Sequence, residues 1–112
     1  MEVRQLNELL LEAFPELKGE FDRYTSWLDG IDTGCFLTYE DLLLPLARQA
    51  LEQKDEKTIG RVAAFIERLL GLDDDYAENV ATVALLEGLK AGHGGVARVR
   101  LGERGSAVYD TL

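Results

Sequence analysis

The fold is decided by one stretch, TIGRVAAFIERLLGLDDDYAENVATVALLEGL, which runs from Thr58 to Leu89. Apolar residues recur in it at the i, i+3, i+4 and i+7 spacing of an amphipathic helix, first as far as Leu70 and then again from Val80. Gly71 and three aspartates separate the two runs, a composition that is typical of a tight turn. The stretch therefore predicts a central helical hairpin, with both helices in the core.

The turn of this hairpin, Asp73-Asp74-Asp75, is strongly acidic. Aspartate is favoured at the positive end of a helix, and Asp75 with Glu78 has the spacing of a capping box. Asp55 is placed to cap the first helix of the hairpin, with Glu56 beside it. Because successive turns stack in helical-repeat folds, we expect Asp55, Glu56 and the acidic turn to line one edge and to meet a partner there.

The composition is that of one folded domain covering residues 1–112. The chain has 112 residues, of which 46% are hydrophobic and 29% are charged. It contains one cysteine, so no intramolecular disulfide is expected, and it has neither the layout of a signal peptide nor an apolar run of about 20 residues. These features predict a cytoplasmic protein.

The charge is unevenly distributed along the chain. The formal net charge is −9, and residues 1–89 hold 19 acidic and 8 basic residues, whereas residues 90–112 hold 2 acidic and 4 basic ones. A surface of that sign repels nucleic acid and anionic membranes, and it attracts a basic protein partner. Acidic surfaces also keep small proteins soluble, so the charge has a second explanation that needs no partner.

Four further helices are predicted at residues 2–14, 15–28, 38–53 and 106–112. Pro15 separates the first two, because proline ends one helix and suits the first position of the next. Thr38 is expected to cap the third helix and Pro45 to kink it. Trp27 lies beside the apolar stripe of the second helix, where most tryptophans are at least partly buried, and an exposed one would be a natural contact anchor. Gly92 is expected to end the hairpin's second helix.

The segments that start at Asp55 and at Asp73 superpose at an offset of 18 residues, each as a charged turn followed by an apolar helix. Stacked units of this kind form α-solenoids. The sequence therefore predicts an all-α domain of about five or six helices, arranged as a short HEAT- or armadillo-like stack.

Three segments also carry a family resemblance. They are Glu40-Asp41-Leu42-Leu43-Leu44-Pro45, the segment from Asp55 through Arg61 to Leu70, and the segment from Asn79 to Leu89. Over these segments the chain resembles a family of small bacterial all-helical proteins with HEAT-like packing and no established activity. In size and charge such proteins are similar to the immunity proteins of bacterial toxin systems. The resemblance implies a helical stack, and the analogy with immunity proteins implies a protein-binding role.

The loop from Asp29 to Glu40 offers an alternative function as a degenerate calcium loop. Counted from Asp29, Thr33 is fifth, Gly34 sixth and Glu40 twelfth, as in an EF-hand, and helices are predicted on both sides. The third position is Ile31, which cannot bind a cation through its side chain. A calcium-responsive helix pair therefore stays open as the second interpretation.

No residue pattern predicts an enzyme or a cofactor. Cys35 and His93, each the only residue of its type, are far apart in sequence, and nothing predicts that they meet as a nucleophilic pair. No group of polar residues converges on the predicted apolar faces. The favoured function is non-enzymatic binding of a basic protein, through Asp55, Glu56, Asp73, Asp74 and Asp75, with no catalytic residue and no metal.

Overall fold

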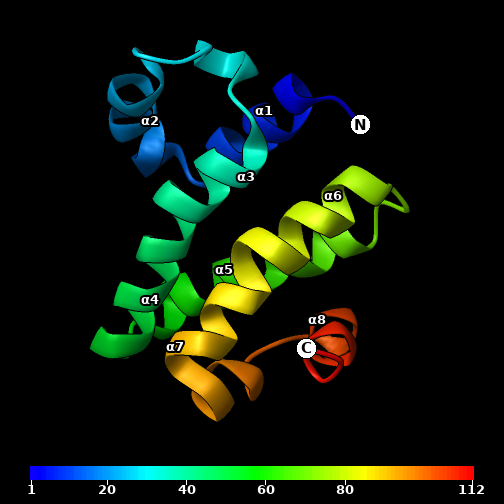
Figure 1. The fold of residues 1–112 in the computed structure, drawn as a ribbon. Helices are drawn as coiled ribbons and strands as arrows, with labels where there is room; N and C mark the ends of the chain where they lie inside the picture. Colours follow the sequence, from blue (N-terminus) through cyan, green and yellow to red (C-terminus); the bar gives the residue numbers. More distant parts are fainter.

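Two long helices, each interrupted by a π-helical segment, form the front of the molecule in Figure 1, and α5 runs behind them. The computed structural model describes all of residues 1–112, and it confirms the all-α prediction because no strand is present. The elements in order are α1 (Val3–Ala13), η1 (Pro15–Leu17), α2 (Lys18–Thr25), η2 (Gly30–Asp32), α3 (Cys35–Thr38), η3 (Tyr39–Leu43), α4 (Leu44–Gln53), α5 (Glu56–Leu70), α6 (Asp75–Asn79), η4 (Val80–Leu86), α7 (Glu87–Arg98) and α8 (Glu103–Tyr109).

Continuous helical backbone joins these elements into two long helices, one over residues 35–53 and one from residue 75 to the break at Gly94. Both run from the top to the bottom of Figure 1, and α5 connects the end of one to the start of the other in the opposite direction. This alternation is what a HEAT-like stack requires, although the stack itself stays a prediction. No helix of the structure combines the length and the apolar character needed to cross a bilayer.

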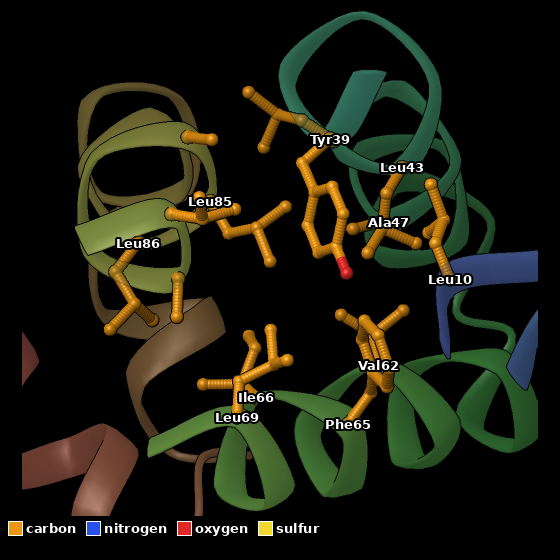
Figure 2. Close-up of a cluster of buried hydrophobic side chains, with 14 of the residues drawn as sticks. Leu10, Tyr39, Leu43, Ala47, Val62, Phe65, Ile66, Leu69, Leu85 and Leu86 are labelled. Atoms are coloured by element: carbon orange, nitrogen blue, oxygen red, sulfur yellow. The ribbon is translucent and has the colours of Figure 1, made fainter. Parts of the chain in front are cut away.

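The core fills the space between the two long helices and α5. Figure 2 shows Leu85 and Leu86 on one side, Tyr39 and Leu43 on another, and Phe65 below them. Phe65 stacks on the Tyr39 ring, with the ring centres 6.0 Å apart, and the Tyr39 hydroxyl donates to the Leu6 carbonyl at 2.7 Å. Full burial of each such side chain is worth about 1.5–3 kcal/mol before chain entropy is subtracted. The hairpin predicted from Thr58 to Leu89 therefore supplies much of the core.

The two π-helical segments, η3 and η4, lie against each other. A kink near Pro45 was predicted, and η3 ends just before it, where the missing proline N–H interrupts the usual bonding pattern. Nothing in the sequence of η4 predicted its wider turn. Just after η4, a Cβ atom on Gly88 would collide with the buried side chain of Leu44. The two long helices therefore approach closely here, which is the reason that glycine occupies this position.

Two predicted helix boundaries near the loop are wrong. The helix expected to start with Thr38 as its cap begins at Cys35, with Gly34 before it. Thr38 is fully buried inside this helix, and its hydroxyl donates to Asn7 Oδ1 at 2.7 Å. Thr38 therefore bonds to Asn7 of α1 instead of capping the start of its own helix. At the loop's other end, α2 stops at Thr25 rather than at residue 28.

The C-terminal region also differs from expectation. The second long helix breaks at Gly94, two residues beyond the predicted stop at Gly92, where φ is 42° and ψ is −125°, and a separate helical segment then reaches Arg98. The last helix begins at Glu103, earlier than the predicted residue 106. Tyr109 is buried as expected, with the Lys90 ammonium 5.3 Å from the centre of its ring. Lys90 thereby joins α7 to α8.

Candidate functional site: an acidic groove

The predicted site residues at the start of α5, Asp55 and Glu56, already bind other groups of the same chain. Asp55 caps the helix, because its carboxylate accepts from the Thr58 backbone N–H at 3.2 Å and from the Thr58 hydroxyl at 2.7 Å. Glu56 pairs with the Arg100 guanidinium at 2.7 Å. The hydrogen bonds from Thr58 lower the pKa of Asp55, and the bond from Arg100 lowers the pKa of Glu56. A partner would have to displace these internal contacts.

In the acidic turn, one of the three aspartates binds other groups of the same chain. Asp74, and not Asp75 as predicted, caps α6, because its carboxylate accepts from the Ala77 N–H at 2.9 Å. Asp74 also contacts the amino group of Met1, which is the main reason that its pKa is lowered, and the Ala77 bond adds to the shift. Asp73 takes a left-handed conformation with φ of 54°, and its side chain and that of Asp75 are exposed. Two of the three aspartates therefore remain accessible.

The two predicted acidic clusters do not share an edge. Asp55 and Glu56 lie at the start of α5, whereas Asp73, Asp74 and Asp75 follow its end. A helix of 15 residues is about 22 Å long, so the clusters are separated by that length. The expectation that successive turns stack was wrong here, because turns at opposite ends of one helix point to opposite sides of a helical hairpin.

The loop proposed for calcium is organised by a different group. Asn7 of α1 is fully buried, and its amide donates to the Ile31 carbonyl at 2.9 Å and to the Thr33 carbonyl at 2.8 Å. Its own carbonyl oxygen accepts from Thr38, which belongs to α3. A single asparagine thus uses both ends of its amide to hold the loop and the helix that follows it.

The side chains expected to bind calcium are not gathered into one set. Thr33 is buried, and its hydroxyl accepts from the Asp29 backbone N–H at 3.1 Å. Asp32 pairs with Arg4 at 2.9 Å, and Glu40 lies further along, in η3. The structure contains no group of three or more histidine, cysteine or acidic side chains arranged to hold a metal ion. The EF-hand-like spacing of Asp29, Thr33 and Glu40 therefore reflects a loop closed by Asn7.

The structure instead places carboxylates together in a groove between the two long helices. We call this the acidic groove. It has a volume of about 440 Å³, and it lies along the line where α4 and α7 pack against each other. Its lining consists of Glu40, Asp41, Leu44, Pro45, Arg48, Val83, Ala84, Glu87 and Gly88. Three carboxylates and one guanidinium therefore face the same space.

The charges of the acidic groove are only partly neutralised. Arg48, the one cation in the lining, donates to the Gly88 carbonyl at 3.1 Å, and it forms no ion pair with a carboxylate. Asp41 accepts from the Tyr24 hydroxyl, a bond that raises the pKa of Tyr24 to about 12. Glu40 and Glu87 have no ion-pair partner. The groove therefore keeps a net negative charge that cations of another molecule can meet.

The acidic groove also has apolar surface. Val83 is 49% exposed, although it belongs to a helix that was predicted to lie in the core, and Pro45 is exposed on the opposite wall. A lysine or arginine side chain matches this mixture, because its methylene stem packs on apolar atoms while its charged end stays near carboxylates. The arrangement suits basic side chains of a protein partner better than a small anion.

Sequence reasoning missed Glu87 and assigned Glu40 to another role. The two residues are 47 positions apart, and they share a groove only because the long helices cross near Gly88. A glycine inside an otherwise strongly apolar helix was the one available signal, because it often marks a close approach of two backbones.

The remaining reactive side chains are placed apart. Cys35 is buried, its thiol contacts the Val3 carbonyl at 3.4 Å, and burial raises its pKa to about 11. His93 lies near the end of the other long helix, with its Nε2 3.7 Å from a carboxylate oxygen of Glu52. An apolar pocket near Ile66 has a volume of about 20 Å³, which is enough for one water but not for a substrate.

Comparison with known proteins gives one family. No curated protein and no solved structure matches the chain. Residues 7–103 match the family model described as "Domain of unknown function (DUF7674)". This match takes in the helix that carries Asn7 and both walls of the acidic groove. Since it covers most of the 112 residues, the chain belongs to this family of domains of unknown function.

Proposed function

We propose that this protein is a non-enzymatic binding domain that masks a basic protein partner. The specific form we favour is that of a bacterial immunity protein, which covers the basic surface of a nuclease toxin in the cytoplasm. On this proposal the HEAT-like stack of helices is a scaffold, and the partner's lysine and arginine residues enter the acidic groove.

The observation that carries the proposal is the charge balance of the groove. Glu40, Asp41 and Glu87 line it with a single cation, Arg48, which is engaged with a backbone carbonyl. Some carboxylates elsewhere have a cationic partner within the chain, as Glu56 does, but in the groove three carboxylates converge on one space. Unneutralised carboxylates beside exposed apolar surface favour recognition of basic side chains, and the net charge of −9 accelerates encounter with a basic molecule.

The experiment compares two double variants that remove the same charge from different places. Glu40→Gln/Glu87→Gln neutralises the acidic groove, and Asp73→Asn/Asp75→Asn neutralises the exposed part of the acidic turn. Each tagged protein is used to capture partners from a lysate of its native host at low and high salt, and the captured proteins are identified by mass spectrometry.

We expect the unmodified protein to retain one basic protein in a stoichiometric amount at low salt. The groove variant should lose it, while the turn variant should retain it. Exposed charge pairs are worth about 0.2–1 kcal/mol each, so each lost carboxylate should weaken the isolated complex by up to about five-fold. Equal retention by both variants, or binding that does not depend on salt, would contradict the proposal.

A further inference from the structure

A second exposed surface lies beside the acidic groove, at the end of α2. Trp27 is 91% exposed, and it is the only tryptophan of the chain. Leu28, which follows it, is 47% exposed. A large aromatic side chain with this exposure contributes little to the stability of the fold, and exposed tryptophans are frequent anchors of protein interfaces.

A hydrogen bond links the end of α2 to the acidic groove. Figure 1 shows the loop that joins α2 and α3 at the top of the molecule. Below the loop, the Tyr24 hydroxyl of α2 donates to Asp41 of η3, which lines the groove. Trp27 and Leu28 follow Tyr24 by three and four residues, just beyond the end of α2, so the exposed pair lies close to this bond in the chain.

The loop that carries this surface is held in place. Asn7 binds the carbonyls of Ile31 and Thr33, as described above, and Thr25 closes the last turn of α2 by donating to the Phe21 carbonyl at 2.7 Å. The exposure of Trp27 is therefore a property of an ordered turn. A preorganised apolar surface loses little conformational entropy when a partner covers it.

The charges around this surface define what can cover it. Asp29 and Glu40 are exposed and have no ion-pair partner, and Asp41 leads directly into the acidic groove. Arg23, one turn before Trp27, is the nearest cation on α2. A second copy of the chain would bring another net charge of −9 to the contact, whereas a basic segment would be attracted.

We propose that Trp27 and Leu28 form an apolar anchor site for a basic amphipathic segment of the partner, whose lysine or arginine residues continue along Asp41 and Glu40 into the acidic groove. This inference rests on the proposed function and deepens it, because it defines the partner's chemistry. The partner segment carries apolar side chains at one end of its binding face and basic side chains along the rest.

The single tryptophan makes the test direct. The probe is a synthetic amphipathic peptide built of leucine and lysine, and the readouts are the emission of Trp27 and its quenching by acrylamide. One control peptide keeps the lysines and replaces leucine with serine. A second keeps the leucines and replaces lysine with glutamate. Neutral phosphatidylcholine vesicles test whether a lipid surface covers Trp27 instead.

We expect the leucine–lysine peptide to shift the Trp27 emission to shorter wavelengths and to protect it from acrylamide. In calorimetry, Trp27→Ala should lower the affinity for this peptide by about ten- to thirty-fold, which is the effect expected of a residue that anchors an interface. The serine–lysine peptide should bind more weakly, and its affinity should be the same for the parent and for Trp27→Ala. Because Trp27 is exposed, Trp27→Ala should keep the thermal transition of the parent, and Trp27→Phe should recover most of the affinity.

The outcomes separate the two proposals. Salt-dependent binding that is lost in Glu40→Gln/Glu87→Gln but unchanged in Trp27→Ala would leave the groove intact and overturn the anchor site. Binding lost in Trp27→Ala but unchanged in the groove variant would support the anchor and contradict the groove. Equal binding of the leucine–glutamate peptide, or a larger emission shift with vesicles than with the leucine–lysine peptide, would overturn the anchor site.

Discussion

The acidic turn at Asp73, Asp74 and Asp75 and the acidic groove hold the same kind of side chain, but they use it differently. In the turn, Asp74 caps α6 and contacts the amino group of Met1. In the groove, Glu40 and Glu87 face a cavity of about 440 Å³ without a cationic partner. Asp73 and Asp75 of the turn are also exposed and unpaired, so the groove differs because its carboxylates line one shared hollow together with apolar side chains.

The largest expected effect comes from removing the buried asparagine that holds the loop before α3. Asn7→Ala leaves the carbonyls of Ile31 and Thr33 and the hydroxyl of Thr38 without their buried partner. Unsatisfied buried groups cost about 1–3 kcal/mol each, so the free energy of unfolding should fall by about 3 kcal/mol or more in urea denaturation. The exposed Asn79→Ala is the matched control, and it should change that free energy by less than about 0.5 kcal/mol.

The next effect concerns the crossing that forms the groove. Gly88→Ala places a methyl group against Leu44, and it should lower the free energy of unfolding by about 1–3 kcal/mol. Gly60→Ala, on the open side of α5, meets no neighbouring atom and should instead raise it by about 0.5–1 kcal/mol through helix propensity. Two glycine substitutions with effects of opposite sign in the same denaturation assay would confirm the close approach. A neutral Gly88→Ala would contradict it.

A smaller effect distinguishes the two acidic regions directly. Asp74→Ala should lower the melting temperature because it removes the cap of α6, whereas Asp75→Ala should change it little. Glu87→Ala in the groove should leave the melting temperature unchanged or raise it, because it relieves unneutralised charge. A fall with Glu87→Ala equal to that with Asp74→Ala would mean that the groove is structural.

The smallest effect is the pH dependence of stability that arises from the carboxylates with internal partners. The pKa values of Asp55, Glu56 and Asp74 are lowered in the folded protein, so their contribution is complete above the ordinary carboxyl pKa of about 4. It is lost as the pH falls from there through the lowered values. The difference in melting temperature between the parent and Asp74→Ala should therefore be constant near neutral pH and shrink under acid conditions. A difference that grows on acidification would contradict the assignment.

Short sequence patterns correctly predicted the features that depend on residues close in the chain. The spacing of Ile66 and Leu69 and the position of Asp55 gave the α5 helix and its cap, since both depend on neighbours within a few residues. The start of the third helix was wrong because Thr38 found a distant partner in Asn7. The acidic groove was missed because its walls meet only through the packing of η3 and η4, which no short pattern encodes.

Asn7 also has a consequence for the order of folding. Asn7 and Leu6 bind residues 24 to 33 positions away, so contacts between distant residues join α1 to the loop and to α3. Such contacts close long loops, so they form at a greater entropic cost than contacts within a hairpin. We expect α1 and α3 to open together as one cooperative unit, with amide hydrogens that exchange sooner than those of α5.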